Sequence, residues 1–218
     1  MLAIAGGKGG VGKTTTALGL AAALPGKPLV VDADRDMPDL HALAGVNPEP
    51  GLDAAVRDQS GHGQPCPQHD CRVLPAPRGD APRTDRLLNR LAAKHGGDDG
   101  TEEPILVDTP AGVSVDAAAP LQAVDAVLLV STACAPALRD AAKTASMARA
   151  VGTPVIGVLL TRAVVRPPGA GDLLDCSVVG CIPSEPTQPL ESHRVQERYS
   201  AIANRLREAA PAEIGCEN

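Results

Sequence analysis

The most informative stretch of the sequence is the glycine-rich segment GGKGGVGKTT at residues 6–15. Within it, Gly7, Gly12, Lys13 and Thr14 fit the phosphate-binding pattern G-x4-G-K-S/T. Glycines let such a loop turn its backbone N–H groups toward an anion at the start of a helix. Lys13 is expected to reach the β- and γ-phosphates of a nucleotide, and the Thr14 hydroxyl to ligate Mg²⁺. The segment therefore predicts a nucleotide-binding loop.

Aspartates follow two of the apolar runs. Asp108 ends the run ILVD, Asp32 ends the run LVVD, and Asp34 comes two residues later. In open α/β sheets, ligands bind at the carboxyl ends of the strands, and carboxylates hold Mg²⁺ directly or through water. Asp32, Asp108 and Thr14 are therefore the expected metal ligands.

Short apolar runs alternate with helical stretches along the chain. The apolar runs at 2–5, 28–32, 72–75, 105–108, 126–131, 155–161 and 177–182 are mostly continuous, which is typical of strands buried on both faces. Helices are expected at 13–24, 84–95, 137–151 and 192–209, and surface loops at 58–71 and 165–171. The pattern predicts the α/β class: a doubly wound, mostly parallel sheet of about seven strands with helices on both faces. We expect residues 1–218 to form a single domain.

The motif KGGVGKT, with its second lysine Lys8, resembles the deviant Walker A motif of the MinD/ParA family of ATPases. The resemblance covers most of the chain: residues 29–41 resemble the second strand and switch I, and residues 105–112 resemble the Walker B and switch II segment. It implies that Asp34 positions the attacking water and that Lys8 reaches across a dimer interface into the partner's nucleotide. Lys8, Lys13 and Asp34 are the catalytic residues that it implies.

The resemblance also implies an Mg²⁺-dependent ATPase that forms a homodimer when ATP binds. The expected nucleotide contacts are Gly7, Lys8, Gly9, Gly10, Val11, Gly12, Lys13, Thr14, Thr15, Thr161, Arg162 and Pro183. Family members usually carry Asn-Arg where this chain has Thr161-Arg162, with the Asn reading adenine. A threonine hydroxyl reads a base edge less specifically than an amide does. ATP is still the expected nucleotide, because no guanine signature of the Asn/Thr-Lys-x-Asp type lies nearby.

Composition limits the classes of partner. The net charge of −6 makes a general nucleic-acid binder a poor candidate, and the absence of Phe and Trp removes the aromatic platforms that stack single strands. Four arginines of the last helix keep a DNA-binding patch open as an alternative to a solvated face: Arg194, Arg198, Arg205 and Arg207. Membrane binding is not expected, because Pro211 should end the last helix and the tail has no Lys, Phe or Trp, whereas a membrane-surface helix needs a wide apolar face together with cations.

Location and source follow from similar arguments. The chain has no long apolar run and no signal peptide, so we expect a cytoplasmic protein with mostly reduced cysteines. Arginine outnumbers lysine 15 to 5, which a GC-rich genome or a salt-adapted, haloarchaeal cytoplasm would both explain.

Two cysteine pairs have C-x4-C spacing, which falls within the zinc-ligand range: Cys66 with Cys71, and Cys176 with Cys181. His62 and His69 lie close to the first pair, but a site there would wrap a very tight loop with two prolines. The fold that the sequence resembles places the two pairs toward opposite edges of the sheet. We therefore expect no bound metal there, and we expect Cys134, Cys176 and Cys181 to be small core residues.

The favoured function is an ATP-dependent dimerisation switch that positions or partitions a cellular component through an unidentified protein partner or cargo. A DNA-partitioning ATPase is the alternative within the same chemistry. A metabolic or metal-cofactor carrier enzyme is a second alternative, but it needs a further substrate pocket, for which the chain shows no extra domain. A nucleotide-binding regulator without turnover is a third, and intact Lys8, Asp34 and Asp108 argue against it.

Overall fold

A central sheet of eight strands organises the molecule. The structure, a computed structural model, describes residues 1–57, 63–77, 83–95 and 103–209. The strands are β1 (Leu2–Ala5), β2 (Leu29–Asp32), β3 (Gln64–Pro65), β4 (Arg72–Leu74), β5 (Ile105–Asp108), β6 (Ala126–Thr132), β7 (Val155–Thr161) and β8 (Val178–Ile182). They lie in the order β3-β4-β2-β5-β1-β6-β7-β8. Every pair is parallel except β3 with β4, which is antiparallel.

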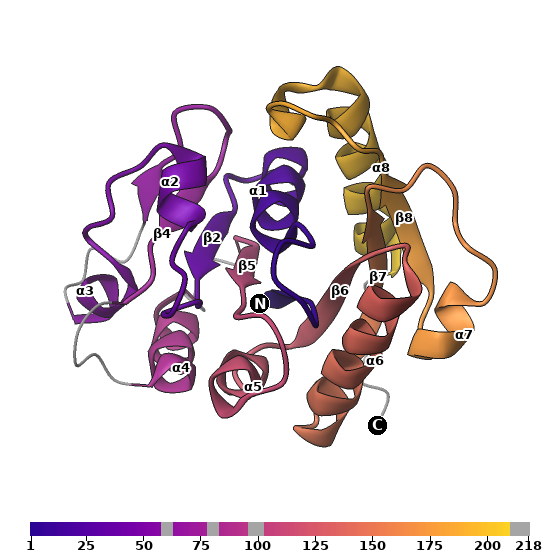
Figure 1. Cartoon of the computed structure of the whole chain (residues 1–218). Helices are drawn as coiled ribbons and strands as arrows, with labels where there is room; N and C mark the ends of the chain where they lie inside the picture. Colours follow the sequence, from indigo (N-terminus) through magenta and orange to yellow (C-terminus); the bar gives the residue numbers. More distant parts are fainter. Residues whose placement is uncertain (58–62, 78–82, 96–102, 210–218) are drawn as a thin grey trace, which may run out of the picture.

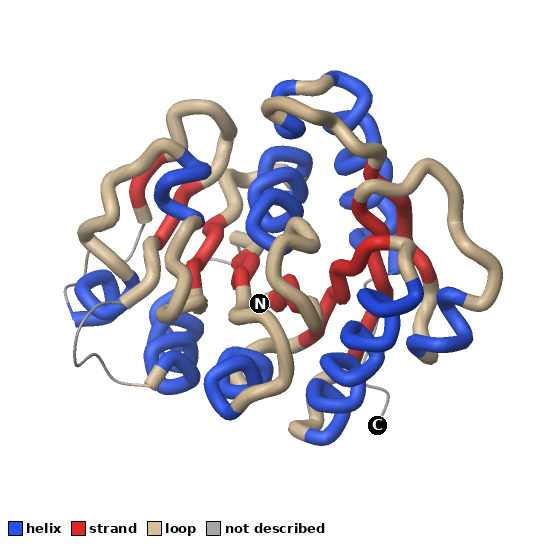
Figure 2. Tube along the Cα trace, viewed as in Figure 1, coloured by secondary structure: helices blue, strands red, loops and turns tan. Residues whose placement is uncertain are grey.

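Helices cover both faces of this sheet (Figures 1 and 2). They are α1 (Lys13–Ala23), α2 (Leu40–Ala44), α3 (Leu52–Arg57), α4 (Thr84–His95), α5 (Val115–Leu121), α6 (Ala135–Ala150), α7 (Ala170–Leu174) and α8 (His193–Ala209), with a 3-10 turn at Pro189–Glu191. Figure 1 shows α1, α2 and α8 on one side of the strands and α4, α5 and α6 on the other. The parallel strands are thus shielded from water on both faces, as parallel sheets require.

Two cores follow from the two-residue period of the strands. In β1, Ala3 and Ala5 pack with helices α3 to α7, whereas Ile4 packs with α1 and α8. Both cores consist mainly of Ala, Val, Leu and Ile. The single tyrosine, Tyr199 of α8, is buried in the second core, and its hydroxyl lies 3.3 Å from Thr16 Oγ1 of α1. These side chains hold α1, and with it the start of the glycine-rich loop, against the sheet.

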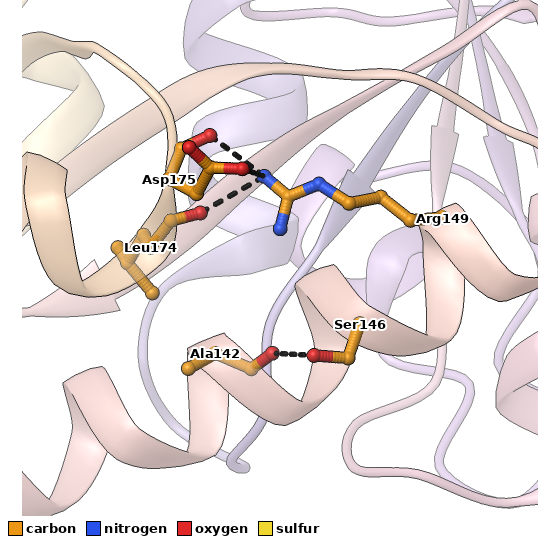
Figure 3. A network of polar contacts seen from close by, with 5 residues as sticks. All are labelled: Ala142, Ser146, Arg149, Leu174 and Asp175. Carbon is orange, nitrogen blue, oxygen red and sulfur yellow. Dashed lines mark hydrogen bonds and ion pairs between the residues drawn. The ribbon is translucent and has the colours of Figure 1, made fainter.

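Helix α7 is fixed by a side chain of α6 (Figure 3). Arg149 donates hydrogen bonds from Nη2 to the carbonyl oxygens of Leu174 (2.9 Å) and Asp175 (2.7 Å). These carbonyls lie at the end of α7, where the helix leaves them without internal partners. The contact ties the connection between β7 and β8 to α6.

The predicted doubly wound α/β fold is confirmed. All seven predicted strands and all four predicted helices are present, with ends within two residues of the prediction. The eighth strand, β3, lies inside the expected loop 58–71, of which 58–62 fall outside the described residues. Helices α2, α3, α5 and α7 were not predicted, and α7 begins inside the expected loop 165–171. Among the described residues, no helix is long and apolar enough to cross a membrane.

Candidate nucleotide-binding site

The glycine-rich loop joins the end of β1 to the start of α1. Close packing explains one of its glycines: a Cβ on Gly7 would lie 2.2 Å from the backbone of Asp140 in α6. Gly10 and Gly12 have φ angles of 72° and 96°, in the left-handed region that favours glycine. Helix α1 starts directly after Gly12. The loop therefore has the backbone that the phosphate-binding pattern predicts.

The two aspartates at the strand ends are neighbours. Asp32 of β2 and Asp108 of β5 occupy paired positions in adjacent parallel strands. The two-residue period turns both side chains to the α1 face, because Val30 and Leu106, two residues earlier, pack in the core of that face. Their exposed fractions are 0% and 2%. Burial, and then the charge of Asp108, raises the pKa of Asp32 to about 8.

Asp108 also faces the start of α1. Burial raises its pKa to about 7, while the Thr14 hydroxyl and the Lys13 charge act in the opposite direction. Lys13 is itself only 8% exposed. The Oδ1 atom of Asp108 is buried and has no hydrogen-bond partner among the described residues. A buried carboxylate oxygen without a partner has an unmet need for a donor or a cation.

Mg²⁺ fits this donor set. No group of three or more His, Cys, Asp or Glu side chains in the described part of the chain is arranged to hold a metal ion by itself. Mg²⁺ does not need one, because it is usually held by one or two protein oxygens together with phosphates and waters. Asp108 Oδ1 and the Thr14 hydroxyl are the oxygens that would hold it beside a nucleotide. Bound there, the ion would neutralise charge on the phosphates.

Asp32, which was expected to ligate Mg²⁺, already uses both carboxylate oxygens in hydrogen bonds to backbone N–H groups. Its Oδ1 accepts the Asp34 N–H (2.9 Å) and its Oδ2 accepts the Leu40 N–H (3.3 Å). The Asp34 side chain in turn accepts the Met37 N–H at 3.0 Å. Asp32 thus holds both ends of the segment 33–39, which carries the predicted water-positioning residue Asp34 at the rim of the site.

Asp39 is a residue of the site that the sequence patterns did not single out. The Thr14 hydroxyl donates a hydrogen bond to Asp39 Oδ1 at 3.1 Å, and the charge of Asp39 raises the pKa of Asp108. No signal in the sequence pointed to it, because the short helix α2 that follows Asp39 was not predicted.

The segment after Asp108 contacts the glycine-rich loop as well. The Thr109 hydroxyl donates to the Ile4 carbonyl at 3.0 Å, and the Gly112 N–H donates to the Gly6 carbonyl at 3.2 Å. Both segments that follow the aspartates, 33–39 and 109–112, are therefore attached to the phosphate loop or to the strand before it.

The remaining predicted contacts lie at the carboxyl ends of the strands, as the aspartates do. Lys8 is exposed, and its charge lowers the pKa of Asp140 in the first turns of α6, after the larger effect of Lys143. Thr161 ends β7, and its hydroxyl donates to the Val11 carbonyl at 2.6 Å. Pro183 is buried just after β8, and no described hydrogen bond joins it to the loop.

The cysteine pairs lie at opposite edges of the sheet, as expected. Cys66 and Cys71 flank the β3–β4 turn, where the Cys66 N–H donates to the Cys71 carbonyl at 3.0 Å, while Cys181 belongs to β8. His62 lies outside the described residues. The expectation that Cys134 is a core residue is wrong: it is exposed, because it immediately precedes α6 at the loop end of β6.

Together, the phosphate loop, the buried strand-end aspartates and the parallel sheet define a P-loop nucleotide-binding protein. The family model of the CobQ/CobB/MinD/ParA nucleotide binding domain matches residues 2–170. The chain belongs to this family.

Known proteins resemble the chain over most of its length. It is 31% identical over 175 residues to an uncharacterized ATP-binding protein of Methanocaldococcus jannaschii, a match that covers 74% of this chain and 64% of that protein. It is similar to the septum site-determining protein MinD of Pyrococcus horikoshii complexed with Mg-ADP (TM-score 0.80, 22% identity, 99% and 98% of the two chains). It is also similar to the cell division ATPase MinD of Pyrococcus furiosus (TM-score 0.80, 25% identity, 96% and 98%).

Proposed function

We propose that this chain is an Mg²⁺-dependent ATPase that forms a homodimer in its ATP-bound form and separates after hydrolysis. The observation that carries the proposal is the convergence of buried Lys13, the unpartnered Oδ1 of Asp108 and the Thr14 hydroxyl on one glycine-rich loop. These are the groups that bind the phosphates of a nucleotide and its metal ion. The relatives described as ATP-binding and as complexed with Mg-ADP support ATP and Mg²⁺ as the cofactors.

Each residue has a separate role in hydrolysis. Asp34, at the rim of the site, accepts a hydrogen bond from the water that attacks the γ-phosphorus, and the bond between this phosphorus and the β–γ bridging oxygen breaks. Lys13 stabilises the negative charge on the β- and γ-phosphate oxygens as that bond breaks. The products are ADP and inorganic phosphate. Turnover is expected to be slow, because the output is a change of partner.

The dimer is supported by the position of Lys8 and of the apolar side chains around the site. Lys8 is exposed at the mouth of the loop, where it is available to a second nucleotide. Met37, Val113 and Val115 are 75%, 54% and 75% exposed. Met37 belongs to the segment 33–39, and Val113 and Val115 follow the segment 109–112 at the start of α5. Large exposed apolar patches mark interaction surfaces, and these side chains would contribute to such a patch in the dimer that we propose. Because these segments contact the phosphate loop, loss of the γ-phosphate would change this surface.

We also propose that the switch positions or partitions a cellular component. The MinD relatives are a septum site-determining protein and a cell division ATPase, which supports a role of this class. A protein partner would recognise the ATP-bound dimer, and a cytoplasmic location fits such a role.

Two substitutions test the mechanism. Asp34→Ala should keep ATP binding, stop hydrolysis and accumulate as a dimer in Mg²⁺-ATP but not in ADP. Adding Lys8→Ala should remove that dimer while leaving nucleotide affinity largely intact, because Lys13 and the loop amides remain. Each charge-assisted contact contributes about 1.5–3 kcal/mol, and two are lost per dimer, so dimerisation should weaken by roughly a hundredfold or more.

Size-exclusion chromatography with light scattering gives the answer, with phosphate release measured on the same samples. Asp36→Ala, which changes an exposed aspartate in the same segment, is the matched control and should behave as wild type. An Asp34→Ala protein that stays monomeric in saturating ATP, or a double variant that still dimerises, would contradict the dimer mechanism.

A further inference from the structure

Two consecutive residues at the end of β7 bind the outer side of the phosphate loop. Thr161 donates its hydroxyl proton to the Val11 carbonyl at 2.6 Å. Arg162 donates from Nη2 to the Gly10 carbonyl at 2.8 Å. Arg162 has a φ angle of 52°, a left-handed conformation that is uncommon for arginine. Two adjacent side chains thus hold two adjacent carbonyls of the loop, and we call Thr161 and Arg162 the β7 brace.

The brace fixes the direction of two N–H groups. In a trans peptide unit, the carbonyl of one residue and the N–H of the next point in opposite directions. With the Gly10 and Val11 carbonyls directed at the brace, the N–H groups of Val11 and Gly12 point away from β7. Neither N–H donates to any group in the described part of the chain. These two N–H groups are therefore held in place and remain available to an anion.

The loop conformation and the brace depend on each other. The left-handed φ angles of Gly10 and Gly12 lie on either side of Val11 and rotate the two peptide units. At Gly12 the backbone also comes close to the brace, since a Cβ there would lie 3.4 Å from Thr161 Cγ2. Thr161 is buried, and its neighbour on β6, Thr132, contacts Cys134 instead of the loop.

The hydrogen bonds of the Thr161 hydroxyl limit how it can contact a nucleotide base. A hydroxyl has one proton to donate. The nearer acceptor is the Val11 carbonyl, and the second, the Ser131 carbonyl at 3.3 Å, is also backbone. The donor capacity of Thr161 is therefore used inside the protein, and a base edge cannot receive it without breaking the contact with the loop.

We propose that Thr161 and Arg162 are positioning residues for the phosphates of the nucleotide, acting through the Val11 and Gly10 carbonyls, and are not readers of the base. This inference rests on the proposed nucleotide-binding function. It implies that loss of the brace lowers the affinity for every polyphosphate ligand by the same factor, whatever base the ligand carries.

Three probes separate the two roles: Mg²⁺-ATP, Mg²⁺-GTP and Mg²⁺-tripolyphosphate, which has no base. Thr161→Val keeps the shape of the side chain and removes the donor. Calorimetric titration should show affinity for all three probes lower by a common factor of roughly three to ten, as expected for one lost hydrogen bond. Thr161→Ser restores the donor and should restore affinity. Arg162→Ala changes an exposed side chain. It should also lower the affinity for all three probes by a common factor.

The matched control is Thr132→Val, at the paired position of β6, which should stay within about twofold of wild type. If Thr161→Val lowers the affinity for ATP but not for tripolyphosphate, Thr161 reads the base and the proposed positioning role is overturned. If Thr161→Val leaves all three affinities unchanged, or Thr161→Ser fails to restore them, the brace is overturned as well. Wild-type protein that binds none of the probes overturns the proposed function itself, which distinguishes that failure from the others.

Discussion

The Thr14 hydroxyl donates a hydrogen bond to Asp39 Oδ1 at 3.1 Å and so joins the first turn of α1 to the residue before α2. The partners are 25 residues apart in the chain. The contact exists because Asp32 accepts the N–H groups of Asp34 and Leu40 and thereby folds the segment 33–39 back toward the phosphate loop. The hydroxyl proposed to bind Mg²⁺ is therefore held by the segment that is proposed to respond to the nucleotide.

Asp39 should control how strongly Mg²⁺ enhances nucleotide binding. Its negative charge lies beside Thr14 and acts on Asp108, so it attracts a cation and repels a phosphate. In Asp39→Asn, ADP binding without Mg²⁺ should become tighter, and the gain in affinity on adding Mg²⁺ should fall by on the order of tenfold. Titrations in EDTA and in Mg²⁺ measure both quantities. Asp36→Asn, an exposed aspartate of the same segment, is the control and should keep the wild-type ratio.

Lys13 should be required for nucleotide binding. It is the buried lysine of the phosphate loop, and its charge would contact the β- and γ-phosphates directly. Lys13→Ala should lower the affinity for Mg²⁺-ATP by at least about tenfold, the effect of a lost charge-assisted contact. Isothermal calorimetry measures it, with the exposed Lys27→Ala as control. Unchanged affinity in Lys13→Ala would show that the loop does not bind phosphate.

The sequence was sufficient for the parts of the fold with strong periodic signals. Runs such as AVLLVS and VIGVLLT are long, continuous and apolar, so the predicted strands correspond to β6 and β7. Helix α5, by contrast, has seven residues and contains Pro120, and such a short segment gives no helical period to detect. Strand β3 has two residues, one of them Pro65, and exists only because it pairs with β4.

The site residues likewise divide into those that the sequence predicts and those that depend on tertiary contacts. Lys13, Thr14 and Asp108 belong to local patterns, so their convergence could be predicted from the loop motif and the strand ends. The contact of Thr14 with Asp39 could not, because it depends on how 33–39 folds around Asp32. The position of Thr161 at the edge facing the loop was predicted, but its partner, the Val11 carbonyl, is a tertiary contact across 150 residues.

The thiols should differ strongly in reactivity. Cys134 is exposed, and the Thr132 hydroxyl, the Ala137 N–H and the Lys8 charge lower its pKa. Cys71 is buried, and burial together with the neighbouring Cys66 raises its pKa to about 12. In a Cys216→Ser background, a thiol reagent at pH 7.5 should label Cys134 first, and Cys134→Ser should remove the fast phase. A fast phase that survives Cys134→Ser would contradict the assignment.

The placement of the cysteine pairs argues against bound zinc. The two pairs lie at opposite edges of the sheet, and in the described part of the chain no three His, Cys, Asp or Glu side chains are grouped to hold a metal ion. Elemental analysis of the purified protein should find far less than one zinc per chain. A stoichiometric metal that is lost in the Cys66→Ser, Cys71→Ser double variant would overturn this prediction.

Stability without nucleotide or Mg²⁺ should fall as the pH rises from 5 to 8. The pKa values of Asp32 and Asp108 are about 8 and about 7 in the folded protein, against 3.8 for an ordinary aspartate. Between pH 4 and these values, the folded state keeps protons that the unfolded state has lost. The free energy of unfolding therefore decreases with rising pH, by at most about 1.4 kcal/mol per pH unit for each group.

Asp32→Asn should make this dependence shallower, because an amide has no proton to lose in this range. The variant gives up one of the two hydrogen bonds to Asp34 and Leu40, so it should be less stable than wild type at pH 5. The difference should shrink, or change sign, at pH 8. Urea unfolding at pH 5, 6.5 and 8 measures the slope, with Asp36→Asn as the control that should follow wild type. An Asp32→Asn slope equal to that of wild type would mean that Asp32 is ionised throughout this range, and that the buried pair with Asp108 carries its charge on Asp32.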